Sequence, residues 1–302
     1  MCAWVLVFCC LASGAGPSAP APNEVLTELL ETGISAPGGP AVKLPPPSLP
    51  DGLDAKRQTD ALAKLPGARH SVDQLLRKSV VAPFELKIHP PPEAQGESSL
   101  WRVDAWFIAY GSLEEVAQED FLKRWSRLGG GKETSDVGSS EGLSRAGKLS
   151  DAEIADRKLF KAGEKQPDEY FLYSTFSLFD RVQLSATRHA AITRSDESLL
   201  IAAKIDPRFD ADEQHPNQWR PMKRDELGKI EAGKPHPYED AGFYAKVTRL
   251  KQPAGALFVE YHQAFQEPRA WFGGANLLRS KLPILAQDAV RDFRRKLKAK
   301  AE

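Results

Sequence analysis

The chain has 302 residues, and its 41 Lys and Arg residues balance its 41 Asp and Glu residues. This balance excludes a bulk charge that would attract nucleic acid. A hydrophobic content of 41% with 27% charged residues is typical of a soluble globular protein whose length allows a large buried core.

The N-terminal residues carry no charge and include an apolar run over residues 3–12. That run is too short to cross a bilayer, and small residues follow it, so residues 1–20 are predicted to be a signal peptide. The protein is then exported, either periplasmic or secreted; lipid anchoring at Cys9 or Cys10 is the less favoured alternative. All three cysteines (Cys2, Cys9 and Cys10) fall in this segment, so the mature chain would have no disulfide, catalytic thiolate or cysteine zinc site.

Residues 21–68 are rich in Pro and Ala, with KLPPPSLP (43–50) near the centre and a short helix expected over residues 24–31. This composition favours extended polyproline conformations, and we expect a disordered linker. A spacer is favoured over the alternative, a docking motif for a proline-binding module. The folded domain is predicted to cover residues 69–302.

The first half of this domain mixes strands with short helices. Strands are expected at residues 84–89 and 103–110, and helices that begin at Ser71 and Ser112 extend to Val80 and Trp125. A Gly- and Ser-rich flexible insertion is expected over residues 129–148, followed by a helix over 151–160.

The second half of the domain is dominated by antiparallel hairpins. The strands are expected at residues 169–179, 181–194, 199–206, 242–250 and 256–265, with a loop over 207–240 and a long final helix. Helices do not alternate with strands as a parallel sheet requires, so the fold class is α+β.

This order of elements resembles that of START-like helix-grip domains. The hairpin at 186–207 is similar to the paired central strands of the family, with Ala190 in place of a frequent aromatic residue, and Asn276 precedes Pro283 as in its terminal helix. The resemblance covers about residues 81–297. It implies a curved antiparallel sheet wrapped around the C-terminal helix, with a lipid or other apolar small molecule between them.

The terminal helix has an apolar stripe at spacings of three and four residues, namely Leu278, Leu282, Leu285, Ala289, Phe293 and Leu297. Pro283 removes a backbone donor, so a break or kink is expected near residues 280–282, with Ser280 as the cap of the main helix. Trp271 and Phe272 are expected to seal one end of the sheet.

Strand alternation places two charged side chains among apolar ones. Arg188 shares the parity of Leu184 and Ala186, and Asp104 shares that of Trp106. An inward Arg188 requires a partner or an anionic ligand group; a β-bulge that turns it to solvent is the alternative. The expected ligand-binding residues are Arg188, Asp104, Trp106, Tyr261, Trp271 and Leu285.

The sequence predicts a non-catalytic binding protein without a cofactor or metal, because no histidine pair has the helical spacing of a zinc site. The alternatives are a cell-envelope interaction module without a ligand and a cyclase- or hydrolase-like enzyme that uses Glu260 and His262. The basic tail (291–302) complements the helix dipole or, alternatively, contacts an anionic membrane.

Overall fold

The computed structural model describes residues 23–35, 39–91, 98–118, 121, 145–160, 168–224, 226, 230–272 and 277–298. Within these residues the strands form one 11-stranded antiparallel sheet, whose main path is β1-β2-β11-β10-β6-β5-β4-β3. This open sheet and the long C-terminal helix confirm the expected α+β helix-grip class.

The strands of the sheet are β1 (Glu85–His89), β2 (Ser98–Tyr110), β3 (Arg145–Lys148), β4 (Glu169–Leu178), β5 (Val182–Arg194), β6 (Ser198–Ile205), β7 (Gln218–Arg224), β8 (Ile230–Ala232), β9 (His236–Pro237), β10 (Ala241–Arg249) and β11 (Ala256–Pro268). The helices are α1 (Glu24–Glu31), α2 (Ala55–Leu62), α3 (Val72–Leu75), α4 (Leu113–Val116), α6 (Asp151–Asp156) and α7 (Leu277–Lys298). Two 3₁₀ turns, η1 (Pro207–Phe209) and η2 (Arg269–Trp271), complete the described elements.

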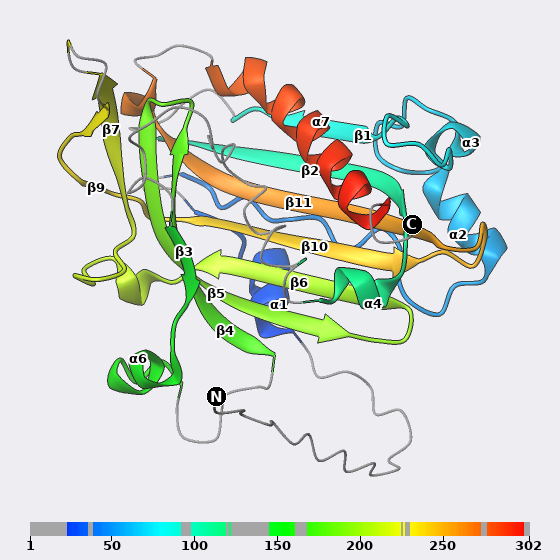
Figure 1. Ribbon diagram of the computed structural model, residues 1–302, viewed down its shortest axis with the longest axis horizontal. Helices are drawn as coiled ribbons and strands as arrows, with labels where there is room; N and C mark the ends of the chain where they lie inside the picture. The colour runs from blue at the N-terminus through cyan, green and yellow to red at the C-terminus, as the bar shows by residue number, and fades with distance from the viewer. Residues whose placement is uncertain are drawn as a thin grey trace, which may run out of the picture.

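The sheet is covered on both faces. Figure 1 shows α7 across β1 and β2 on one face and α1 on the opposite face. We call these the α7 face and the N-terminal face. Strand β2 contributes to both, because Phe107 packs with Phe293 of α7 while Trp106 packs with Leu49 and Leu62 of the N-terminal segment. Burial on both sides explains why this strand is apolar at nearly every position.

The short helices begin at serines, as predicted for Ser71 and Ser112. Ser71, Ser112 and Ser150 each accept a hydrogen bond from the amide three residues later, and the Gln or Glu side chain there accepts one from the serine amide. These capping boxes satisfy backbone donors at the helix starts. The helices are shorter than the sequence suggested, ending at Leu75, Val116 and Asp156.

The prediction of a loop over residues 207–240 is wrong, because β7, β8 and β9 lie within it. Strand β7 pairs with β5 and buries Trp219 beside Leu184. Prolines and charges in this stretch hid the short strands. Of the expected insertion, residues 129–144 lie outside the described part of the chain, and Arg145–Lys148 form β3 against β4.

The described part of residues 21–68 is also folded, so the expectation of a disordered linker is wrong there. Helix α1 has the predicted bounds and buries Val25 and Leu29 against the N-terminal face. Helix α2 begins at its cap Asp54 and buries Leu62. The apolar residues among the prolines are buried against the N-terminal face of the sheet, which the composition alone does not predict. The predicted signal peptide lies outside the described residues.

Helix α7 continues through Pro283, so the expected break is wrong. Pro283 lies in the second turn, where it removes one backbone bond, and the Ser280 hydroxyl donates to the Leu277 carbonyl (2.9 Å) instead of capping a new helix. Leu278, Val290, Phe293 and Leu297 are fully buried. Their burial contributes roughly 6–12 kcal/mol gross. Leu282, Leu285 and Ala289 of the predicted stripe are half-buried.

Arg294 fixes the C-terminal half of α7 to the sheet edge. Its guanidinium donates to the carbonyl oxygens of Ile108 (2.8 Å), Ala82 (2.5 Å) and Pro83 (3.0 Å), and more weakly to that of Val80 (3.3 Å). Burial lowers its pKa to about 10, so the group stays charged near neutral pH. These bonds pin the helix beside β1 and β2.

Candidate functional site

Two apolar clusters lie at opposite ends of α7. One contains Phe293 and Leu297 with residues of β2, β10 and β11, and the other contains Leu278 and Trp271 with residues of β5. Between the clusters the α7 face presents small side chains, namely Ala105, Ala190, Ala203 and Ala245. Beside these alanines lie Phe243, Tyr261 and Gln263, which are partly exposed. The four alanines are 1–6% exposed and form an apolar floor of small side chains.

Arg188 lies beside this floor, on the α7 face, as the strand alternation predicts. The register of β5 is continuous with its neighbours, which excludes the predicted alternative of a bulge, and Arg188 stands opposite Leu172 and Ile205. Its Nη1 donates to the Ser174 hydroxyl at 2.7 Å. Burial lowers its pKa, against the influence of the Tyr238 and Tyr261 hydroxyls.

No carboxylate in the described part of the chain forms an ion pair with Arg188. A partly buried cation without a counter-charge is costly in free energy, and that cost is reduced by an anionic group that enters beside it. Ser174 orients the guanidinium, and its other donors form no hydrogen bond with the residues that the structure describes. The chemistry of this position is therefore that of an anion receptor next to an apolar surface.

Tyr261, Trp271 and Leu285 also lie on the α7 side of the sheet. Tyr261 stacks on Phe243 with ring centroids 5.6 Å apart and donates to Gln263 Oε1 at 2.9 Å. Trp271 is buried 5.6 Å from the ring of Tyr238, as a seal at the end of the sheet requires. Leu285 is half-buried on α7. Tyr261 is therefore placed beside the alanine floor, while Trp271 belongs to the cluster at its end.

Asp104 and Trp106 do not join Arg188, so their expected placement in one ligand site is wrong. Both side chains point to the N-terminal face, opposite to Arg188. The sequence pattern could not choose the face, because the N-terminal segment makes both faces of β2 apolar. The expected charged pair of Arg188 and Asp104 is separated by the sheet itself.

Asp104 instead belongs to a polar cluster that is buried on the N-terminal face. It accepts from His262 Nδ1 (2.8 Å) and lies 2.7 Å from His89 Nε2 and 3.1 Å from Arg102 Nη2. His262 Nε2 is 3.6 Å from Glu260 Oε2. Burial disfavours charge on His262, but the hydrogen bond with Asp104 and the nearby carboxylate of Glu260 prevail and raise its pKa. Burial raises the pKa of Asp104, but its contacts with His262, Arg102 and His89 outweigh that effect and lower the pKa.

Residues 43–51, which we call the strap, cover this cluster. The Ser48 amide donates to Glu260 Oε2 (2.7 Å), and Trp106 Nε1 donates to the Ser48 hydroxyl (3.0 Å). Glu260 and His262 share one strand face, as predicted, but both are 0% exposed beneath the strap. In this arrangement no substrate reaches them, which argues against the enzyme alternative.

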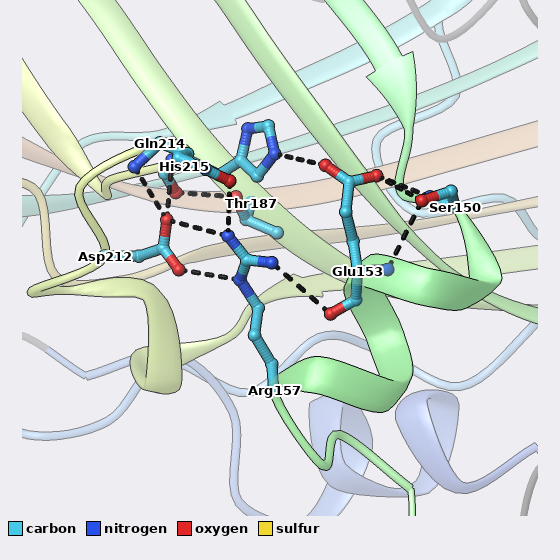
Figure 2. Close-up of polar contacts among 7 residues, drawn as sticks. All are labelled: Ser150, Glu153, Arg157, Thr187, Asp212, Gln214 and His215. Carbon is cyan, nitrogen blue, oxygen red and sulfur yellow. Dashed lines mark hydrogen bonds and ion pairs between the residues drawn. The ribbon is translucent and has the colours of Figure 1, made fainter.

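A second polar cluster joins α6 to the chain that follows β6 (Figure 2). Arg157 forms an ion pair with Asp212 (2.7 Å), and His215 Nε2 lies 2.9 Å from Glu153 Oε1. The hydroxyl of Thr187 donates to the His215 carbonyl at 2.8 Å. The bond with His215 lowers the pKa of Glu153 to about 2. Most of these groups bond to one another, although His215 Nδ1 has no partner among the described residues, and we interpret the cluster as a structural contact that fixes β5 next to Arg188.

A small pocket of about 220 Å³ lies between α7 and the residues before β1. It is lined by His70, Val81, Ala82, Pro83, Phe84, Gln287, Val290, Arg291 and Arg294. Ligand pockets usually measure roughly 300–1,000 Å³, so this volume is too small for a lipid. Among the described residues, no group of His, Cys, Asp and Glu is placed to hold a metal ion. No helix in the described ranges is long and apolar enough to cross a membrane.

Comparison with known proteins finds similarity to solved structures. No family model matches the chain, and no curated protein matches it. Among solved structures, the chain is similar to the crystal structure of human STARD10, with 8% identity and a TM-score of 0.37 over 72% of this chain and 74% of that chain. A similarity this distant gives no information about the ligand. Any inference about the ligand therefore rests on the residues of the site.

Proposed function

We propose that this protein binds an apolar or amphipathic small molecule with an anionic group, such as a lipid, without catalysing a reaction on it. The molecule lies between the sheet and α7, over the alanine floor. Arg188 meets the anionic group, while Phe243 and Tyr261 contact the apolar part. The observation that carries this proposal is the partly buried guanidinium of Arg188, held by Ser174 and without a carboxylate partner in the described residues.

The test compares a fluorescent fatty acid with its neutral methyl ester. Arg188→Met is expected to weaken binding of the acid about tenfold, because it removes one charge-assisted hydrogen bond of about 1.5 kcal/mol. Binding of the ester should stay within about twofold. Arg194→Met, at the exposed end of the same strand, is the matched control. Equal losses for acid and ester, or no binding of either by the wild type, contradict the proposal.

We also propose that the outer side of α7 contacts an anionic membrane surface. Ile284 of α7 and Val81 are 52% and 68% exposed; Lys281 is exposed one turn before Ile284, Arg279 is exposed nearer the N-terminus of the helix, and Asp288 is exposed one turn after Ile284. Apolar residues flanked by cations suit an anionic bilayer surface. The double charge reversal Arg279→Glu/Lys281→Glu should abolish co-sedimentation with phosphatidylglycerol vesicles. Equal sedimentation of the wild type with phosphatidylcholine vesicles, or none with either, contradicts this contact.

Export is the third part of the proposal and rests on residues 1–20 alone. The intact mass of the protein recovered from cells tests it. Loss of about the first 20 residues supports a cleaved signal peptide, and an added acyl mass at Cys9 or Cys10 supports the lipid anchor. A full-length, unmodified chain contradicts both.

A further inference from the structure

Two neighbouring rows of polar and aromatic side chains cross the N-terminal face beneath the strap. Asp104, His262 and Tyr244 are cross-strand partners in one row. Trp106, Glu260 and Lys246 form the next row in the same register. All six are buried. Each row consists of one residue from β2, one from β11 and one from β10. Burying this many polar groups costs folding free energy unless the chain that covers them supplies hydrogen-bond partners.

The strap forms hydrogen bonds with these side chains mostly through its backbone. The Tyr244 hydroxyl donates to the Pro45 carbonyl (2.7 Å), and Lys246 Nζ donates to the Leu49 carbonyl (2.8 Å). Between these points the Ser48 amide donates to Glu260 Oε2. Pro45, Pro46 and Pro47 have no N–H group, so this run of the strap offers only carbonyl acceptors. Aromatic side chains with donor groups are the usual receptors for extended proline-rich segments.

Two leucines anchor the strap at its ends. Leu44 is buried beside Tyr244 and Leu100, and Leu49 is buried beside Trp106 and Phe258. Pro46, between them, is exposed, as are Lys43 and Pro50. The contacts are those of a bound peptide: apolar anchors in two clusters and backbone hydrogen bonds between them, with the intervening proline facing solvent.

The strap leaves part of the cluster's hydrogen-bonding capacity unused. Among the residues that the structure describes, Glu260 Oε1 and His262 Nε2 are buried and have no hydrogen-bond partner. Both residues are 0% exposed. In a cluster with a purely structural role, both oxygen atoms of a buried carboxylate are expected to accept hydrogen bonds.

We propose that the N-terminal face is a binding site for a proline-rich segment with a leucine at each end, and that the strap is its ligand, bound within the same chain. The site binds such a segment as a separable peptide when the strap is weakened. This site lies on the opposite face from Arg188, so the inference is independent of the small-molecule site. A tethered strap competes at an effective concentration of about millimolar, so free peptide binds the wild type poorly.

The test uses a fluorescein-labelled peptide of residues 41–52 and the full chain with Leu44→Ser and Leu49→Ser. Fluorescence anisotropy should show saturable binding to this strap-weakened chain and at least tenfold weaker binding to the wild type. A peptide carrying the same two serines should not bind. In the strap-weakened background, Tyr244→Phe should weaken binding about fivefold, because it removes the bond to Pro45.

Equal binding of the two peptides, or no binding by a strap-weakened chain that is folded by circular dichroism, overturns the proposal. If that chain does not fold, hydrogen exchange at the Ser48 amide of the wild type decides. Exchange through a local opening that depends weakly on denaturant supports a separable strap. Exchange of this amide only through global unfolding overturns it.

Discussion

The two faces of the sheet bury charge in different ways. On the N-terminal face, His262 lies 2.8 Å from Asp104 and 3.6 Å from Glu260, and Lys246 pairs with Asp51 at 2.8 Å. On the α7 face, Arg188 has the hydroxyl of Ser174 as its partner and no carboxylate among the described residues. The two arrangements lie on different strands of one sheet: the paired groups are on β2, β10 and β11, whereas Arg188 and Ser174 are on β5 and β4.

The contrast separates charges that hold the fold from a charge that is available to a ligand. Paired buried groups are expensive to break, because each removal leaves an uncompensated partner. An unpaired cation has no such partner, so its removal costs little stability. Stability measurements on the two faces therefore test which charges serve the fold.

The largest effect is expected for His262→Ala. It leaves Asp104 and Glu260 buried without the imidazole between them and should lower the free energy of unfolding by about 3–5 kcal/mol. Urea denaturation measures the change. His236→Ala is the control, because His236 is exposed and stacks on Trp219, and it should cost within about 1.5 kcal/mol. Equal losses for the two variants would mean that the buried cluster does not stabilise the fold.

A matched pair of substitutions compares the faces directly. Lys246→Met removes a cation that donates to the Leu49 carbonyl and pairs with Asp51, which should cost about 1.5–3 kcal/mol. Arg188→Met should change the free energy of unfolding by less than about 1 kcal/mol, because no ion pair is lost. Thermal and urea unfolding of both variants measure this difference. A loss at Arg188 as large as that at Lys246 would assign Arg188 to the fold.

The smallest effect is a pH dependence that is specific to His262. Because its pKa is raised in the folded state, its contribution is complete below the unfolded value of about 6.5 and is lost as pH rises through the folded value. The stability difference between wild type and His262→Gln should therefore shrink from about pH 6.5 upward. A difference that grows with pH contradicts this sign.

Other groups contribute to the overall profile, so the difference between variants is the useful quantity. Asp104, Glu260, Arg102 and His89 face or neighbour His262, and Lys246 with Asp51 lies in the next row. Burial lowers the pKa of His189 and, together with Arg102, that of His89. Those two histidines reduce stability as pH falls, which is the opposite direction.

The sequence predicts the hairpins, the helix starts and the inward face of Arg188, because these depend on local alternation and capping. It does not predict the folding of residues 23–68, because Leu44 and Leu49 find their burial against strands more than 50 residues away. The predicted placement of Asp104 beside Arg188 is wrong for a related reason. A strand that is buried on both faces has no sequence pattern that tells the two faces apart. The inward face of a strand becomes readable only when the cover of each face is known.

Arg294 gives α7 an uneven attachment along its length. Its guanidinium donates to four carbonyl oxygens and so attaches the C-terminal half of α7 to the sheet. Val290, Phe293 and Leu297 are buried around it. From Arg279 to Ala289 no side chain is fully buried. Protection of the helix amides against exchange should therefore rise toward the C-terminus. The helix is therefore held at two places, around Arg294 and at Leu278 in the cluster of Trp271, and the turns between them are its least buried part.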